Sequence, residues 1–176
     1  MNLFSIHISE IKLIKLVAKK DRLAQKYLFD LYAPKMLSTC RQYIKDIHEA
    51  EGVMLCAFMK VFQKIDCYKG DGSFEGWIRK IMIRECLSFL RSQKEIVYTD
   101  DINVSKIADE FSEIDVSNDY QKLIDDLPKG CKYIFILYVI EGYKHSEIAE
   151  MLNISVGTSK SQLAYAKNLL KQKIER

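Results

Sequence analysis

Small, polar and cationic side chains near the C-terminus have the types and the spacing that reading DNA in the major groove requires. Ser155 is a favourable N-cap residue, and a helix that begins after it carries Lys160 on the flank of one polar face. The other members of that face are Gly157, Ser161, Ala164, Tyr165, Asn168 and Gln172. Short polar groups can reach base edges, and a helix N-terminus favours a phosphate. The pattern therefore indicates DNA as the partner, with the solvated face of an ordinary helical hairpin as the alternative.

A shorter helix is predicted just before this one, so that the two form a helix-turn-helix. Ile148, Ala149 and Leu152 lie on one face of the segment 146–152. Asn153 tolerates the left-handed conformation that ends a helix. In the longer helix, the stripe opposite the polar face recurs at the 3.6-residue period and consists of Ser159, Leu163, Ala166 and Leu170. The segment 127–170 is therefore predicted to be a helix-turn-helix with its own supporting helix.

Cations alternate with aromatic side chains in another predicted helix, at residues 74–91. Phe74 and Trp77 stand beside the basic residues Arg79, Lys80, Arg84, Arg91 and Lys94. A single strand of nucleic acid needs positive charge for its backbone and flat faces for its unstacked bases, and this segment supplies both. A solvated basic face around a core tryptophan is the alternative. The inward-facing residues are expected to be Trp77, Ile78, Ile81, Leu87 and Leu90.

Composition favours an all-α protein that works by binding. The 176 residues include two prolines and seven glycines, and 48% are hydrophobic, which is enough for packed cores. A net charge of +3 is too small to establish nucleic-acid binding by itself, so the distribution of charge matters. The segment 93–120 carries eight acidic residues against two lysines, whereas the segment 155–176 has a net charge of +4. The sequence contains no nucleophile, acid–base pair or phosphate loop that predicts an enzyme.

Five cysteines and three histidines are scattered along the chain, without a CxxC pair or histidines at ligand spacing. This arrangement predicts neither a metal site nor a cofactor. An odd number of cysteines on apolar helix faces is typical of reduced, buried thiols in a cytoplasmic protein. Lysines interrupt the apolar run IKLIKLVAKK near the N-terminus, so this segment predicts an amphipathic helix and neither a signal peptide nor a membrane span.

The predicted helices group into two small domains joined by a flexible acidic linker. The first domain is expected at 1–93. Its helices are expected at 9–19, at 21–32, from Pro34 to Ile44, at 49–65 and at 74–91, with a glycine-bearing loop at 68–73. The inward face of the helix at 49–65 is expected to hold Val53, Cys56, Ala57, Lys60 and Val61. The linker is expected at 94–118, where periodicity is weak, and the helix-turn-helix domain at 119–176.

Three long motifs extend this interpretation: EAEGVMLCAFMKVFQKI, FEGWIRKIMIRECLSFLRS and LPKGCKYIFILYVIEGYKHSEIAEMLNISVGTSKSQLAYAK. With these motifs the chain resembles a bacterial RNA polymerase sigma factor of the sigma-70 family, in the small extracytoplasmic-function class. The resemblance covers nearly the whole chain, and EGYKHSEIAEMLNIS and GTSKSQL are its most specific parts. It implies a transcription initiation factor that binds core RNA polymerase, recognises and melts the minus-ten element, and reads the minus-thirty-five element.

For the first domain, the resemblance implies two binding surfaces. The helix at 49–62 corresponds to the one that grips the clamp helices of the largest polymerase subunit. The residues implied there are Glu49, Glu51, Gly52, Leu55 and Cys56. The loop at 68–73 corresponds to the one that captures a base flipped from the minus-ten element, and the following helix to the reader of the non-template strand. The DNA-binding residues implied on that helix are Lys80, Arg84, Ser88 and Arg91.

For the second domain, the resemblance implies one further polymerase contact and the second DNA contact. The part that docks on the flap of the second-largest subunit includes Phe135, Leu137, Tyr138 and Ile140. The minus-thirty-five recognition helix corresponds to 155–167. The DNA-binding residues predicted on and beside it are Ser155, Gly157, Thr158, Lys160, Ser161, Ala164, Tyr165 and Asn168. An anti-sigma factor is implied as a further partner.

Several positions depart from the family pattern. Gly52, Leu55 and Cys56 stand where the polymerase-gripping helix usually has Asp, Gln and Glu. Arg84 and Ser88 replace the commoner Asn and Asp, and Tyr165 stands in place of Arg. Because of these departures, two other functions of the chain stay open beside that of a working sigma factor. One is a stand-alone helix-turn-helix regulator, and the other is a diverged decoy that occupies an anti-sigma factor.

Overall fold

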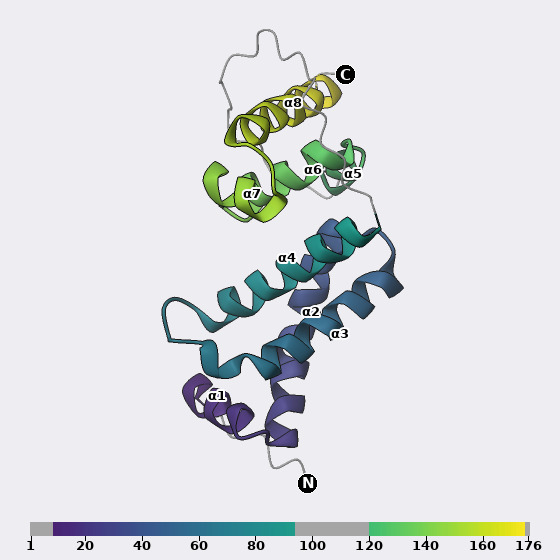
Figure 1. Cartoon of the computed structure of the whole chain (residues 1–176). Coiled ribbons are helices and arrows are strands. Elements are labelled where there is room, and N and C mark those ends of the chain that lie inside the picture. Colours follow the sequence, from purple (N-terminus) through teal and green to yellow (C-terminus); the bar gives the residue numbers. More distant parts are fainter. Residues whose placement is uncertain (1–8, 94–119, 175–176) are drawn as a thin grey trace. The chain divides into compact units, whose positions relative to one another are not determined.

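The computed structural model describes residues 9–93 and 120–174, and every regular element in these two stretches is helical (Figure 1). The chain divides into two compact units, Met1–Phe89 and Leu90–Arg176. The all-α prediction is therefore confirmed for the described residues. The predicted linker at 94–118 lies outside them. Within the described residues, no helix combines the length and the apolar character that crossing a membrane requires.

In its described residues the first unit is built from four α-helices and one 3₁₀ turn, and the last of these helices continues past Phe89. In chain order these are α1 (Glu10–Ala18), α2 (Arg22–Tyr43), α3 (Ile47–Gln63), the 3₁₀ turn η1 (Ile65–Cys67) and α4 (Phe74–Ser92). The long helix α2 packs against α1 and α3, and η1 packs against both of those helices as well. The largest fully buried side chains of these helices are Leu28, Met36, Tyr43, Phe58, Phe74, Ile78, Met82, Ile83, Leu87 and Leu90. A single apolar core thus fixes the directions in which α3 and α4 present their outer faces.

The prediction that the chain would break before Pro34 is wrong, because α2 runs through this residue as one helix. A proline inside a helix lacks the N–H of one backbone hydrogen bond and costs about 3 kcal/mol. Buried side chains recur on both sides of it at a spacing of four, at Leu28, Tyr32, Met36 and Cys40. Their packing spans the interruption and offsets the lost bond.

The helix predicted at 49–65 begins and ends two residues earlier, at Ile47 and Gln63. Asp46 explains the start, because its side chain accepts hydrogen bonds of 2.9 Å from the backbone N–H groups of His48 and Glu49. These bonds also lower the pKa of the Asp46 carboxyl. Two of the five residues predicted to face inward, Cys56 and Lys60, are exposed.

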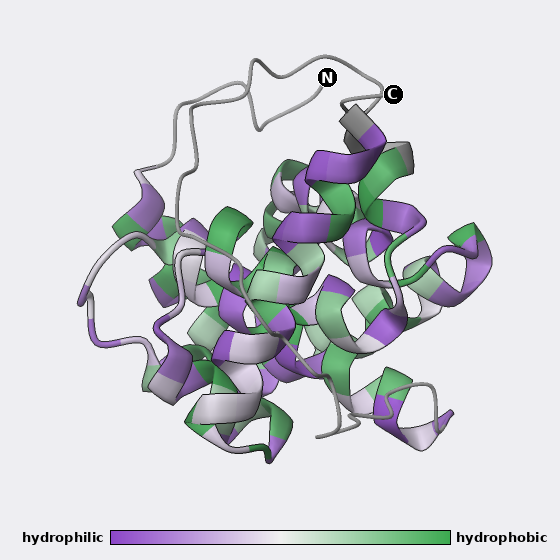
Figure 2. Cartoon of the chain, turned by 90° about the horizontal axis from the view of Figure 1, so that it is seen from above, coloured by the Kyte–Doolittle hydropathy of each residue, from purple (hydrophilic) through white to green (hydrophobic). Residues whose placement is uncertain are grey.

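The second unit contains the predicted helix-turn-helix and its support. Its elements are α5 (Tyr120–Asp125), α6 (Lys129–Phe135), the π-helical turn η2 (Ile136–Ile140), α7 (His145–Leu152) and α8 (Val156–Ile174). The long helix α8 packs against α5, α6 and α7. Apolar and hydrophilic residues alternate along the helices in both units, as amphipathic helices around small cores require (Figure 2). The side chains of Lys132 and Asp125 form an ion pair of 2.6 Å that ties α6 to α5.

Candidate nucleic-acid and partner interfaces

The turn between α7 and α8 has the geometry that the sequence predicts. Asn153 adopts the left-handed conformation, with φ 55° and ψ 51°, and the N–H of Ile154 donates to the carbonyl of Ala149 at 3.0 Å. Ser155 then caps α8, since its hydroxyl oxygen accepts the backbone N–H of Thr158 at 2.9 Å. The inward face of α7, formed by Ile148, Ala149 and Leu152, is buried. The helix-turn-helix prediction is confirmed as a fold.

The two faces of α8 are divided as the spacing predicts. All four residues of the inward stripe, Ser159, Leu163, Ala166 and Leu170, are buried. On the outer side Ser155, Gly157 and Lys160 are exposed. The half-buried members of that side are Ser161, Ala164, Tyr165 and Asn168. These residues form the outer face of α8, which is exposed at its N-terminal end, has small side chains in the middle and polar ones beyond.

Thr158 does not belong to this face, although the sequence places it among the DNA-binding residues. Its side chain is only 8% exposed, and its hydroxyl lies 2.7 Å from the hydroxyl of Ser155. The position follows from helix geometry, because Thr158 is next to the inward residue Ser159. Its role is to complete the cap at the start of α8. Gln162 is buried as well.

A histidine to which the sequence assigns no role, His145 at the start of α7, contacts α8 through its side chain. The imidazole Nδ1 of His145 is 2.8 Å from the hydroxyl oxygen of Ser159, and the ring stacks on Tyr138 with 4.4 Å between ring centroids. Burial lowers the pKa of His145, and the charges of Lys160 and Lys167 lower it further. The helix predicted at 146–152 begins one residue earlier, at His145, and the contact of this residue with Ser159 forms only when α8 packs against α7.

The turn η2 exposes three consecutive apolar side chains, Tyr138, Val139 and Ile140. The N–H of Glu141 bonds to the carbonyl of Ile136 at 3.0 Å, five residues back, so the turn is wider than an α-helical one. Phe135, which the resemblance places in the polymerase-docking part, is only 6% exposed and belongs to the core. Leu137 is fully buried. The exposed apolar surface of this segment is therefore 138–140.

The basic residues of α4 form one exposed stripe. Lys80, Arg84, Ser88 and Arg91 follow one another at intervals of four, four and three residues, and all are exposed. The opposite side of the helix is held by Ile78, Leu87 and Leu90, which are buried as predicted. Ion pairs from Lys35 to Glu75 (2.8 Å) and from Lys60 to Glu85 (2.6 Å) connect α4 with α2 and α3. This exposed row is the α4 stripe.

Aromatic rings gather where the loop at 68–73 enters α4. Trp77, predicted to face inward, is half-buried and stacks on Phe74 with ring planes 15° apart, while Tyr68 lies 5.7 Å from Trp77 between ring centroids. The hydroxyl of Tyr68 donates to the carbonyl of Gly72 at 2.8 Å, and both loop glycines have positive φ. Ser73 caps α4 by accepting the N–H of Gly76 at 3.1 Å. The loop is thus shaped by its own contacts and leaves the half-buried rings of Tyr68 and Trp77 beside it.

Ile81 of α4 is predicted to face inward, and like Trp77 it is half-buried. It precedes the buried pair Met82 and Ile83, which takes the central position on the inner face. The inward face is therefore the predicted one at Ile78, Leu87 and Leu90, with Met82 and Ile83 as additional buried residues.

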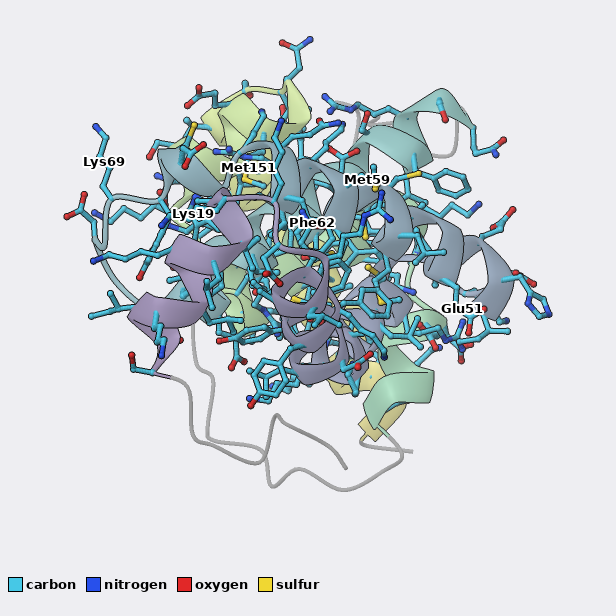
Figure 3. The ribbon with its side chains drawn as sticks, turned by 90° about the horizontal axis from the view of Figure 1, so that it is seen from below. Lys19, Glu51, Met59, Phe62, Lys69 and Met151 are labelled. Carbon is cyan, nitrogen blue, oxygen red and sulfur yellow. The ribbon has the colours of Figure 1, made fainter. Side chains whose placement is uncertain are left out.

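The outer face of α3 carries the residues that the resemblance assigns to polymerase binding. Glu49, Glu51, Gly52, Leu55 and Cys56 are all exposed. A methyl group added at Gly52 would meet nothing within 4 Å. Met59, which the sequence interpretation missed, extends this face by one turn and is 59% exposed, beside Leu55 at 51%. Figure 3 shows Glu51 and Met59 along α3, and Lys69 at the outer edge in the loop that follows.

The cysteines divide into two groups. Cys40, Cys86 and Cys131 are buried, whereas Cys56 and Cys67 are exposed, so the prediction of uniformly buried thiols is wrong for two of them. Burial raises the pKa of Cys131 to about 11, and a hydrogen bond with Cys40 together with burial raises that of Cys86. Among the residues that the structure describes, no cluster of His, Cys, Asp and Glu could hold a metal ion.

Two family models match the chain. The model for sigma-70 region 2 matches residues 28–96, and the model for sigma-70 region 4 matches residues 117–170. The first match contains α3, the loop at 68–73 and α4, and the second contains the helix-turn-helix. The two matched segments thus include every surface described above.

Similar proteins of known identity span almost the same length. The chain is 27% identical to the ECF RNA polymerase sigma factor SigW of Bacillus subtilis, with 93% of this chain and 95% of that protein covered. It is 22% identical to the ECF RNA polymerase sigma-E factor of Haemophilus influenzae, with 93% and 94% covered. Among solved structures, the sigma factor RpoE in complex with the anti-sigma factor NepR from Bartonella quintana has the same fold, with a TM-score of 0.55 and 20% identity. That likeness covers 85% of this chain and 96% of the RpoE chain.

Proposed function

The chain belongs to the sigma-70 family of RNA polymerase sigma factors, in its extracytoplasmic-function class, and we propose how its surfaces direct core RNA polymerase to promoters. It is a transcription initiation factor whose partners are core polymerase and promoter DNA. The observation that carries the assignment is the match of both sigma regions, 2 and 4, to the two helical units. The proposed mode of action is binding alone, in the cytoplasm, without a cofactor.

The outer face of α8 is proposed to read the minus-thirty-five element. Its exposed end consists of Ser155, Gly157 and Lys160, and the first backbone N–H groups of α8 lie at the same end. A helix N-terminus with a nearby lysine suits a DNA phosphate, while the smaller side chains of Ser161 and Ala164 allow the helix to approach base edges. Tyr165 supplies an aromatic ring and a hydroxyl where the family has a cation. Promoter preference at that position is therefore expected to differ.

The α4 stripe is proposed to bind the melted non-template strand of the minus-ten element. Lys80, Arg84 and Arg91 provide three charges along one side, with Ser88 as a short hydrogen-bonding group among them. Positive charge along a path, with aromatic rings at one end, is the usual arrangement for single-stranded DNA. The rings of Tyr68 and Trp77 stand at that end. A base flipped from the duplex can regain at the loop part of the stacking that it loses.

The outer face of α3 is proposed to bind the clamp helices of the largest polymerase subunit. Because Gly52, Leu55 and Cys56 replace polar residues, the face offers apolar area where hydrogen bonds are usual in the family. Met59 continues that area. The exposed apolar residues 138–140 of η2 are proposed to dock on the flap of the second-largest subunit. Both contacts are thus expected to depend on burial of apolar surface more than on charge.

A second candidate function follows from the same α3 face. A chain that had lost polymerase binding could still occupy an anti-sigma factor, and the relatives of known structure include a sigma factor solved with its anti-sigma factor. The two candidates differ in one property. A working sigma factor produces transcripts with core polymerase, and a decoy does not.

The experiment is run-off transcription by core polymerase on a library of random promoters, with and without the purified chain. The proposed function predicts transcripts that appear only when both proteins are present and that share two sequence elements. Changing both Lys80 and Arg84 to Ala should abolish enrichment of the minus-ten element. The matched control changes Lys26, an exposed lysine paired with Asp30 on α2, and should change nothing. Promoter-specific DNA binding without polymerase would instead support a stand-alone regulator, and no transcripts with any promoter would support the decoy.

A further inference from the structure

His145 joins three elements of the second unit, through one face of its ring and through the Nδ1 atom at the ring edge. One face of the imidazole stacks on Tyr138 of η2, with ring planes 24° apart and centroids 4.4 Å apart. The Nδ1 atom lies 2.8 Å from the hydroxyl oxygen of Ser159 on α8. His145 itself is the first residue of α7. The contact between α7 and η2 and the contact between α7 and α8 therefore meet in one side chain.

The two contacts of His145 lead to two surfaces, and the proposed function gives these surfaces different partners. Tyr138 belongs to the exposed apolar segment 138–140, whereas Ser159 is fully buried one residue before Lys160. Ser159 faces the core from the first turns of α8, so the direction of that end of the helix depends on what Ser159 contacts. A shift of the His145 ring would thus be passed to the part of α8 that carries Gly157, Lys160 and Ser161.

We propose that His145 is a positioning residue that couples polymerase docking at Tyr138 to reading of the minus-thirty-five element by α8. This inference rests on the proposed function, in which segment 138–140 docks on polymerase and α8 reads DNA. When a partner holds Tyr138, the stacked imidazole is held as well. Its hydrogen bond with Ser159 then holds the N-terminal end of α8 in the orientation that fits the groove.

The test compares transcription by the holoenzyme from two templates. One is a promoter selected from the random library by the wild-type holoenzyme, and the other is the same promoter with its minus-thirty-five element scrambled. The ratio of the two yields measures reading by α8. His145→Phe keeps a stacking ring and loses the Nδ1 atom, while His145→Asn keeps a polar atom at the Nδ1 position and loses the ring. The pair therefore separates the two contacts of one residue.

Losing one hydrogen bond at the buried end should lower the ratio roughly three- to tenfold in His145→Phe. Ser159→Ala should lower it by a similar factor, and the double variant should be no worse than either single one, because all three lack the same bond. Tyr138→Leu keeps an apolar side chain for docking but removes the stack. As a single change it should lower the ratio. Added to His145→Asn, which already lacks the stack, it should lower the ratio no further. Glu150→Gln, at an exposed position of α7 outside both proposed surfaces, should leave the ratio unchanged.

A purely structural role for His145 would lower the yield from both templates together and leave their ratio unchanged. Thermal unfolding of each variant, followed by circular dichroism, identifies such a loss of fold. The inference is overturned if the ratio stays at the wild-type value in both His145 variants. It is also overturned if the effects of His145→Phe and Ser159→Ala multiply. If the wild-type holoenzyme selects no minus-thirty-five motif at all, the proposed function of α8 fails first and the coupling falls with it.

Discussion

Truncation of Leu55 tests how the outer face of α3 binds polymerase. Leu55 is 51% exposed in the free chain, so about half of its side-chain surface remains to be covered by a partner. Complete burial of a leucine side chain is worth roughly 1.5–3 kcal/mol, and half of that is about 0.8–1.5 kcal/mol. Leu55→Ala should therefore weaken binding of core polymerase by roughly fourfold to twelvefold. The stability of the free chain should hardly change, because the removed atoms are at the surface.

The assay is titration of fluorescently labelled chain with core polymerase at 0.1 M and at 0.5 M salt. Apolar burial predicts nearly the same affinity at both concentrations, since salt screens charges and leaves apolar contacts intact. Leu23→Ala is the matched control, because Leu23 is 60% exposed on α2 and outside the proposed face. The triple change of Gly52 to Asp, Leu55 to Gln and Cys56 to Glu restores the family pattern and should strengthen binding while making it salt-sensitive. The reasoning is refuted if Leu55→Ala binds like the wild type, or if wild-type affinity falls steeply with salt.

Three further predictions concern the second unit. Ser155→Ala removes the cap of α8 and should lower the free energy of unfolding by about 1 kcal/mol in a denaturant titration, whereas Ser146→Ala, at an exposed position without a capping bond, should not. Lys160→Ala should weaken holoenzyme binding to the selected promoter by about 1–3 kcal/mol if the lysine reads a base, and unchanged binding would remove it from the groove. The pKa of His145 lies below its usual 6.5, so the unfolded chain takes up a proton first as the pH falls. The contribution of His145 to the free energy of unfolding should therefore be constant above its ordinary pKa and decrease as the pH falls below it, through the lowered pKa of the folded state. His145→Phe should remove this decrease, and its persistence in that variant would assign it to other groups.

Local chemistry made the helix-turn-helix predictable. Asn153 and Ser155 each act through contacts within a few residues, and the inward stripe of α8 follows from the helical period alone. The same holds for the loop at 68–73, whose glycines take positive φ as their type allows. These features were predictable because the contacts that produce them lie within a few residues of one another in the sequence.

Features that depend on distant contacts could not be predicted in this way. Pro34 is a helix breaker by local rules, and only packing against the rest of the first unit keeps α2 continuous through it. The chain leaves the regular helical period in the π-helical turn Ile136–Ile140, so the exposure of Tyr138 directly after buried Phe135, Ile136 and Leu137 could not be read from that period. Thr158 has a side chain suited to DNA, but its hydroxyl forms a hydrogen bond with the hydroxyl of Ser155. The contact of His145 with Ser159 joins residues fourteen positions apart and appears only in the folded unit.

Opening of a promoter is the most direct test of the central claim. A promoter selected from the library carries 2-aminopurine in the non-template strand of its minus-ten element, and its fluorescence rises when the base unstacks. The account predicts a rise only when core polymerase and the chain are both present, and a much smaller rise when Lys80 and Arg84 of the α4 stripe are changed to Ala. A full rise with core polymerase alone, or an undiminished rise with the double variant, would contradict it.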